Sequence, residues 1–157
     1  MDFRIVKNES ILELLKDYNY PNQELGVIAH IRNNNNEILL QQRGSKSRDE
    51  NFLFEDIGGK IEKEDTDFKS AFIREIKEEA GNNLNINIEN ILGIYHRENK
   101  NKNWVFIVFF VRYISDEFKI MEKDKCLGYK FFTYDELMNS KLVTESCKFL
   151  TKQIINI

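Results

Sequence analysis

Hydrophobic and polar positions along this chain follow patterns that predict several strands. Apolar runs at residues 26–31 and 37–42 are joined by an asparagine-rich stretch at 32–36. This pattern predicts a hairpin, because asparagine tolerates the positive φ angles of tight turns. Further strands are expected at residues 86–95, 104–113, 118–120 and 129–132. The polar stretch at 97–103, between two of these, is expected to be a loop.

The remaining segments predict helices. Helical periodicity and end signals place them at residues 10–18, 67–80 and 145–157. A shorter helix is expected to begin at Thr133 or Asp135 and to end near Met138. A mixed sheet flanked by helices is an α/β fold, and we expect an α/β/α sandwich. No repeat or linker divides the chain, so residues 1–157 are expected to form one domain.

Composition narrows the partners and the compartment. The net charge of −3 gives no basic excess, so no nucleic-acid polymer is expected as a partner. Cys126 and Cys147 form no disulfide pattern, and the charged start lacks a signal-peptide core, which predicts a cytoplasmic protein. The longest apolar run, at 105–111, is too short for a bilayer, so no membrane is expected. His30 and His96 lack neighbours at metal-ligand spacing and are expected to be structural or surface residues.

The helix expected at residues 67–80 carries the strongest chemical signal. Glu75, Glu78 and Glu79 fall on one arc about 100° wide, at 100° per residue. Glu79 is expected at the edge of the apolar stripe, where partial burial strengthens the repulsion between like charges. A divalent cation removes that repulsion, and carboxylate oxygens suit Mg²⁺ or Mn²⁺. The alternative is a solvated surface helix, in which Arg74 and Glu78 form an i,i+4 ion pair.

Glycines on both sides of this helix extend the pattern. Gly58 and Gly59 precede it, where they let the backbone approach a ligand closely, and Gly81 follows it. The segment resembles the Nudix box, G-x5-E-x7-R-E-U-x-E-E-x-G-U with U aliphatic. The matching positions are Gly59, Arg74, Glu75, Ile76, Glu78, Glu79 and Gly81.

The segment departs from the Nudix box in three places. The interval from Gly59 to Arg74 is one residue longer than in the motif. None of residues 64–66 is a unique match to the first glutamate of the motif. One of the polar residues at 65–67 is expected to cap the helix instead. Asn82 stands where an aliphatic residue is usual.

The resemblance implies a Nudix fold and metal-dependent hydrolysis of a diphosphate linked to a nucleoside or another group. It implies Mg²⁺ (or Mn²⁺) held by Glu75, Glu78, Glu79 and the carbonyl oxygen of Gly59. Arg74 would hold one of the glutamates in place by a charge-assisted hydrogen bond. Arg74, Glu78 and Glu79 would thus belong to the catalytic machinery, with Glu79 as a ligand or a base.

Residues outside the box bear on the substrate. Arg43, at the end of the second predicted strand, and Lys60, after the glycines, are candidates to bind phosphate or are simply solvated. The stretch 122–126 is similar to a late segment of MutT-like nucleoside triphosphate pyrophosphohydrolases, with Lys123 in place of the usual proline. This similarity makes Glu122 a candidate catalytic base or base-reading residue. The expected substrate is a nucleoside triphosphate, cleaved to a monophosphate and pyrophosphate.

Other readings stay open or lose support. Tyr95, Trp104 and Phe106 are able to stack a base, although aromatic residues in strands are more often in the core. The prolines of members that act on ADP-ribose or NADH are missing, because Pro21 is the only proline. Isoprenoid diphosphate isomerases need a cysteine before the box, and none precedes Cys126. A pyrophosphatase of a nucleotide conjugate such as a coenzyme A or ADP-ribose type compound, a non-catalytic nucleotide-binding module and a homodimer all stay open.

Overall fold

The structure is a computed structural model of the 157-residue chain. It describes residues 1–6, 10–44, 52–62, 65, 67–80, 85–115 and 126–157. Within these ranges it describes only the backbone at positions 79, 80, 85, 115 and 126. The predicted strand at 118–120 and the candidate residue Glu122 therefore lie outside the described residues.

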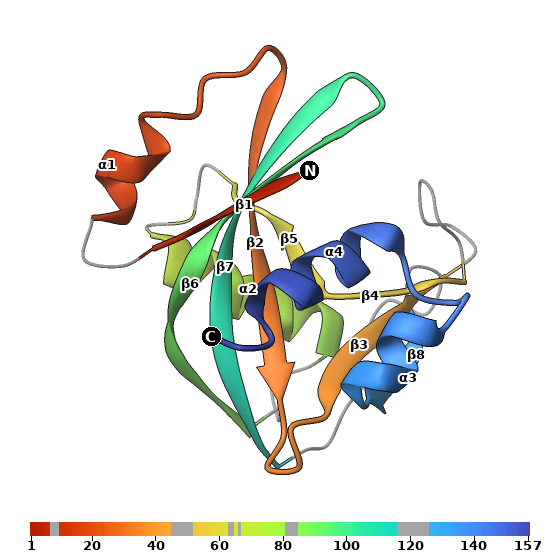
Figure 1. Ribbon diagram of the computed structural model, residues 1–157. Coiled ribbons are helices and arrows are strands. Elements are labelled where there is room, and N and C mark those ends of the chain that lie inside the picture. The colour runs from red at the N-terminus through yellow and green to blue at the C-terminus, as the bar shows by residue number, and fades with distance from the viewer. Residues whose placement is uncertain (7–9, 45–51, 63–64, 66, 81–84, 116–125) are drawn as a thin grey trace.

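A mixed β-sheet runs through the centre of the molecule (Figure 1). Its strands are β1 (Asp2–Ile5), β2 (Gln23–Arg32), β3 (Ile38–Arg43), β4 (Phe54–Glu55), β5 (Ile57–Lys60), β6 (Asn85–Asn99), β7 (Lys102–Ser115) and β8 (Cys126–Phe132). The order is β1-β6-β7-β2-β3-β4, with β5 also paired to β2 and β8 to β3. β2 and β7 run parallel, and the other pairs run antiparallel.

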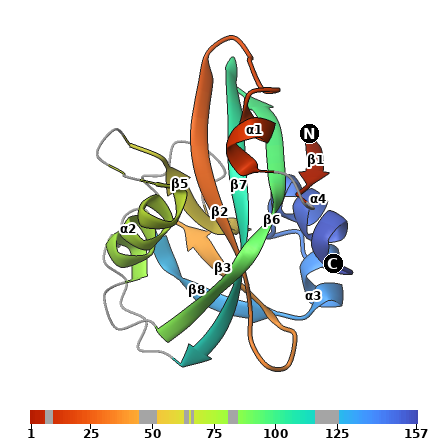
Figure 2. The same cartoon turned by 90° about the vertical axis from the view of Figure 1, so that its left-hand side faces the viewer.

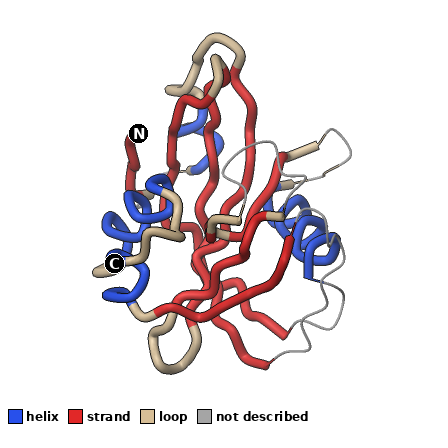
Figure 3. The backbone as a smooth tube through the Cα atoms, turned by 90° about the vertical axis from the view of Figure 1, so that its right-hand side faces the viewer, coloured by secondary structure: helices blue, strands red, loops and turns tan. Residues whose placement is uncertain are grey.

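Helices cover both faces of this sheet (Figures 2 and 3). They are α1 (Ile11–Leu15), α2 (Phe68–Ala80), α3 (Tyr134–Asn139) and α4 (Glu145–Ile154). α2 packs on one face through Phe72 and Ile76, and α4 packs on the other through Leu150 and Ile154. This arrangement confirms the predicted α/β/α sandwich with a mixed sheet. No helix in the described part of the chain is long and apolar enough to cross a bilayer.

β2 shows how the two layers share the central strand. Val27 and Ala29 are buried on the α2 side, whereas Ile28 between them is buried on the α4 side. Successive side chains of a strand point to opposite faces, so a strand covered on both sides is apolar at successive positions, as β2 is at 27–29. β5 pairs antiparallel with β2 and places Gly59 opposite Val27 and Gly58 opposite Ile28. The glycine pair therefore lies in the sheet, between the α2 layer and the α4 layer.

The structure corrects the loop predicted at residues 97–103. β6 and β7 continue through this stretch, and only Lys100 and Asn101 form the turn, with φ of 49° and 65°. The prediction was wrong because the side chains there are polar, whereas the pairing of Glu98 with Asn103 continues the backbone ladder. Backbone hydrogen bonds hold an antiparallel pair whether or not its side chains are apolar. The longer hairpin carries several basic side chains towards β5.

Other elements differ from prediction mainly at their ends. α1 spans only Ile11–Leu15, and α4 stops at Ile154 rather than continuing to the last residue. Thr133 begins α3 as one of the two predicted caps, because its hydroxyl accepts a hydrogen bond from the Glu136 amide at 3.2 Å. The asparagine turn is confirmed, with Asn36 at φ 59°. β1 was not predicted, and it extends the sheet by pairing with β6.

Candidate active site

α2 forms where the sequence predicts it and lies beside β5. Asp67 is its cap, because the Asp67 carboxylate accepts a hydrogen bond from the Ser70 amide at 2.7 Å. Phe72 and Ile76 anchor the helix to the sheet. The helix is therefore fixed in rotation, with its acidic residues near the glycine pair.

Glu75 of this helix is buried, with 8% of the residue exposed. Its carboxyl group packs against Gly59 in the space that a Cβ atom at position 59 would fill. Because Gly59 lacks a side chain, the Glu75 carboxyl can approach the backbone of the sheet closely. The sequence led us to expect such a close approach by a ligand, and here a side chain of the protein makes it. Burial raises the pKa of Glu75 to about 7, the charge of Arg74 opposes this rise, and the charge of Glu78 adds to it.

Arg74 holds this part of the helix in place. Its Nε and Nη2 atoms donate hydrogen bonds to Asp65 at 2.9 and 3.0 Å, so the planar fork of the guanidinium pairs with one carboxylate. Nη1 donates to Glu75 at 3.0 Å and to Glu78 at 3.3 Å, and Nη2 also donates to the Lys60 carbonyl at 2.9 Å. The expected i,i+4 contact with Glu78 is present, but the closest pairing is with Asp65.

Asp65 gives the lengthened interval before Arg74 a physical role. Its Oδ2 atom also accepts a hydrogen bond from the Glu62 amide at 2.8 Å. The hydrogen bonds from Arg74 and from this amide lower the pKa of Asp65 below its usual range. Asp65 therefore supports Arg74, and the helix cap is Asp67. Residues 64 and 66 lie outside the described part of the chain.

The residues at this helix suit a hard divalent cation. The Glu75 carboxyl is buried and its pKa is raised. Glu78 accepts a hydrogen bond from the same Arg74 nitrogen as Glu75 does. A cation nearby would stabilise the ionised form of both groups. The Glu79 side chain and Gly81 lie outside the described residues. Among the residues that are described, no three histidine, cysteine, aspartate or glutamate side chains already form a metal-binding group.

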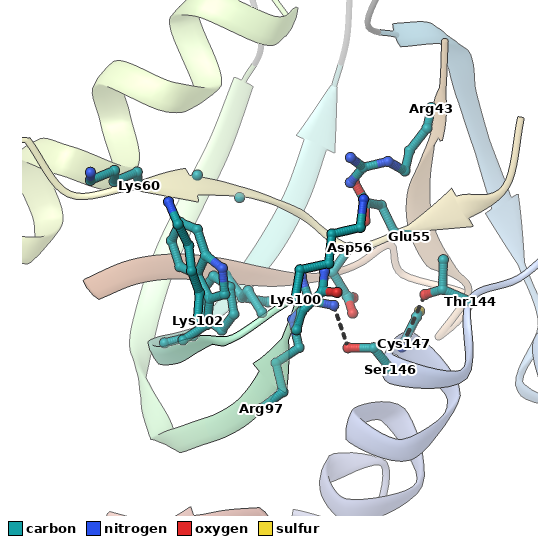
Figure 4. A pocket seen from close by; sticks show the side chains of 16 residues that line it. Arg43, Glu55, Asp56, Lys60, Arg97, Lys100, Lys102, Thr144, Ser146 and Cys147 are labelled. Atoms are coloured by element: carbon teal, nitrogen blue, oxygen red, sulfur yellow. Dashed lines mark hydrogen bonds and ion pairs between the residues drawn. The ribbon is translucent and has the colours of Figure 1, made fainter. Parts of the chain in front are cut away.

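Gly58 and Gly59 also line a pocket of about 290 Å³ on the α4 side of the sheet (Figure 4). Most of the charged side chains described in its wall are basic: Arg43, Lys60, Arg97, Lys100 and Lys102. Glu55 and Asp56 are its acidic lining residues. Gly59 thus borders both this cationic pocket and the Glu75 carboxyl. Arg43 and Lys60, two candidates from the sequence, lie in the same pocket.

The chain matches the NUDIX domain family model over residues 22–153. It belongs to the Nudix family. Nudix hydrolases are in general pyrophosphohydrolases of nucleotide-linked small molecules, and they generally use a divalent metal such as Mg²⁺ or Mn²⁺. The protein is accordingly a Nudix pyrophosphohydrolase. Comparison with curated proteins gives no match.

Solved structures show the same Nudix fold. The MutT protein from Methanosarcina mazei Go1 superposes with a TM-score of 0.74 at 22% identity, covering 85% of this chain and 94% of that chain. A MutT NUDIX hydrolase from Burkholderia pseudomallei gives a TM-score of 0.70 at 25% identity, covering 85% and 99%. A UDP-X diphosphatase gives 0.63 at 22% identity, covering 96% and 72%.

Ion pairs in this Nudix pocket orient the basic side chains. Arg43 ends β3, and its Nη1 atom lies 2.6 Å from Glu55 on the neighbouring β4. Glu24 of β2 lies 2.9 Å from the Lys60 ammonium and 3.5 Å from the Lys102 ammonium. One carboxylate thus contacts two lysines that come from β5 and β7. Sequence reasoning did not identify Glu24, because nothing near it in the chain marks it as functional.

The aromatic candidates divide between the pocket and the core. Trp104 and Phe106 line the pocket, with ring centroids 5.3 Å apart and ring planes 7° apart. Tyr95 is fully buried in the core on the α4 side, and its hydroxyl lies 2.9 Å from the Ser146 hydroxyl. Trp104 is half-buried and lines the pocket with its ring, whereas Phe106 is buried in the same core cluster as Tyr95 and stacks behind Trp104. We call the Trp104 ring, backed by Phe106, the aromatic shelf, and Tyr95 is a core residue.

The histidines have the structural roles that the sequence predicts. His30 is buried, and its Nε2 atom accepts a hydrogen bond from Arg32 at 2.7 Å. His96 stacks on Tyr20 with centroids 3.9 Å apart. Cys147 is a free thiol buried at the pocket wall, and the side chain of Cys126 lies outside the described residues.

Proposed function

We propose that this Nudix enzyme hydrolyses nucleoside triphosphates to a monophosphate and pyrophosphate, with Mg²⁺ (or Mn²⁺) as cofactor. The observation that supports this proposal is the position of Gly59, which lies against the buried Glu75 carboxyl and also lines the cationic pocket. We also propose that residues 1–157 act as one domain. A cytoplasmic location and a homodimer stay predictions.

The charge of the pocket suits a polyphosphate. Among the described residues, five basic side chains and two acidic ones line it, so this wall carries a cationic excess in a chain whose overall charge is −3. A concave cationic surface concentrates and orients anionic ligands. The aromatic shelf in the same pocket offers a flat surface for a base. Arg43 and Lys60 would contact phosphate oxygens in this arrangement.

The proposed roles of the box residues follow from their chemistry. Glu75, Glu78, Glu79 and the Gly59 carbonyl would hold the cation, which neutralises phosphate charge and acidifies a bound water when present. Arg74 positions Glu75 and Glu78 by the hydrogen bonds described above. Glu79 would act as a ligand or as the base. Glu122, outside the described residues, is proposed as a base or base-reading residue from its sequence context.

The second candidate function is hydrolysis of a nucleotide conjugate. A UDP-X diphosphatase shares this fold over 96% of the chain. Nucleotide conjugates therefore stay a candidate class of substrate. Conjugates of the coenzyme A and ADP-ribose types place a diphosphate between two groups rather than at the end of one. Both substrate classes would use the same helix, so product analysis must separate them.

Incubation with each nucleoside triphosphate, nucleotide sugar, ADP-ribose and coenzyme A in Mg²⁺ tests the proposal. Chromatography and a pyrophosphate assay should show monophosphate and pyrophosphate as the products of the best substrate. Glu78→Gln and Glu79→Gln should each lower kcat by several orders of magnitude, whereas Glu13→Gln on the distant α1 should not. Much higher kcat/KM for a conjugate than for any triphosphate would contradict the substrate assignment.

A further inference from the structure

Asp56 is an acidic residue of the pocket for which the proposed hydrolysis has no role. It lies between β4 and β5, and it lines the pocket. Its Oδ1 atom is shielded from solvent and lacks a hydrogen-bond partner among the residues that the structure describes. Burial raises the pKa of Asp56 to about 7, a rise that the Cys147 thiol and the Arg97 charge oppose and Glu55 reinforces.

Arg97 brings an unused donor to the same wall. Its Nη1 atom donates a hydrogen bond to the Ser146 hydroxyl at 3.0 Å. Its Nε atom is buried and, within the described part of the chain, has no acceptor. Arg97 and Asp56 line the same pocket, and Figure 4 shows both side chains near Ser146.

An unpaired donor and an unpaired acceptor in one wall call for an explanation. A buried polar atom without a partner destabilises the folded chain, so native proteins rarely keep one. Here the two atoms are shielded, but both belong to residues that line a ligand pocket and lie far apart in the sequence. They are consistent with partners that a ligand supplies once these side chains turn towards it. The ligand group must then carry a donor and an acceptor close together.

The aromatic shelf indicates what that group is. The Arg97 guanidinium lies over the Phe106 ring, 5.4 Å from its centroid, and Phe106 stacks beside Trp104. Arg97 therefore joins the polar wall to the shelf. A planar ring with N–H and C=O or ring-nitrogen groups on its edge fits both surfaces at once. Among the parts of a nucleotide, only the base has this chemistry.

We propose that Asp56 and Arg97 determine which base the pocket accepts. A base stacked on the Trp104 ring of the aromatic shelf donates an N–H to the Asp56 carboxylate and accepts a hydrogen bond from Arg97. Rotations of the Asp56 and Arg97 side chains on binding, of a kind common at interfaces, bring the shielded oxygen and the shielded nitrogen to the ligand. This inference deepens the proposed function and rests on it for the identity of the substrate.

Trp104 supplies a readout that needs neither metal nor turnover. It is the only tryptophan of the chain and lines the pocket, so its fluorescence reports ligand binding there directly. The four common nucleoside monophosphates are titrated in the presence of EDTA. Inorganic tripolyphosphate is titrated in parallel as an anion that lacks a base. The unmodified protein should bind at least one monophosphate and should distinguish between bases.

Substitutions at Asp56 separate recognition from folding. Asp56→Leu should weaken binding of the preferred monophosphate about 10-fold or more, because the base loses its partner. It should change tripolyphosphate binding less than about 2-fold. Asp56→Asn keeps the shape and should alter the order of preference among bases, because an amide presents a donor beside an acceptor. Asp17→Asn, at an exposed ion pair with Arg4, is the matched control.

Several outcomes would overturn the inference. Equal losses for monophosphate and tripolyphosphate would show a structural role for Asp56, and unchanged monophosphate binding would show no role. Absence of monophosphate binding by the unmodified protein would also overturn it. A fall in kcat for Asp56→Asn with unchanged binding would make Asp56 a catalytic residue instead. If no triphosphate is hydrolysed but these binding differences appear, the proposed function fails while the assignment of Asp56 stands.

Discussion

A carboxyl group that folding removes from water keeps its proton to a higher pH than it does in the unfolded chain. Glu75 is such a group, because burial raises its pKa to about 7 from an ordinary value near 4. Between about pH 4 and pH 7 the folded state binds the proton and the unfolded state has released it. The contribution of Glu75 to the free energy of unfolding is therefore fully present at acidic pH, and it is lost as the pH rises through that interval.

Glu75→Gln tests this directly. Without metal, the variant should be more stable than the parent at pH 8, by several degrees in Tm, and should show little gain at pH 4.5. Mg²⁺ should raise the Tm of the parent at pH 8 and should have much less effect on the variant. Thermal melts at both pH values, with EDTA or Mg²⁺, provide the measurement. An equal change in Tm at the two pH values would argue against a raised pKa, and equal stabilisation by Mg²⁺ would argue against a cation at Glu75.

Individual residues differ in how far the sequence reveals them. Arg74, Glu75 and Glu78 stand in one short helical motif, so their spacing alone showed that they share a surface. Asp56 and Arg97 come from distant segments, and only the pairing of strands brings them to one pocket. Local patterns carry no signal for such a pair, because each residue by itself resembles an ordinary charged surface position.

At the scale of elements, the sheet brings three strands together around one carboxylate. Glu24 on β2 contacts Lys60 on β5 and Lys102 on β7, and these bonds lower the pKa of Glu24. Both ammonium groups line the pocket, so Glu24 holds them where a polyphosphate would bind. Partly exposed ion pairs are weak, and their value here lies in orientation rather than in stability.

Glu24→Gln should therefore raise KM for the best substrate by a modest factor, about 2–5-fold, and leave kcat unchanged. Steady-state kinetics at low and high salt provide the test, because the difference should shrink as salt screens the lysines. Glu13→Gln is the matched control, since Glu13 pairs with Lys16 on α1, away from the pocket. A fall in kcat with constant KM would mean that Glu24 acts in chemistry and not in positioning the lysines.

Elements with a strong local pattern were predicted well, and those held by distant partners were not. α2 was found within one residue because a cap and an apolar stripe define it locally. The ends of β6 and β7 were missed because their side chains at 97–103 are polar and only their mutual pairing makes them strands. That error mattered for the site, since this hairpin carries Lys100 and Lys102.

The whole molecule places its two chemical surfaces on opposite layers of one sheet. The acidic helix α2 lies on one face, the cationic pocket lies on the α4 face, and the glycine pair of β5 lies between them. A Cβ atom at Gly59 would meet the Glu75 carboxyl, which is the end of a flexible side chain. A Cβ atom at Gly58 would instead meet the Val27 carbonyl oxygen and lie 3.1 Å from the Ile28 Cα, neither of which can move away.

Alanine at the two glycines should therefore have different effects. Gly59→Ala should fold with a small loss of Tm but displace the Glu75 carboxyl, so that activity falls about 10–100-fold or more and Mg²⁺ no longer stabilises the protein. Binding of a monophosphate at Trp104 should persist, because the pocket wall stays in place. Gly58→Ala should lower Tm by many degrees and weaken every function together, since the contact between β5 and β2 is broken. Thermal melts, Mg²⁺ titrations and Trp104 fluorescence on both variants make the comparison. Near-parental turnover in Gly59→Ala would show that the close approach of Glu75 to the sheet is not needed for catalysis.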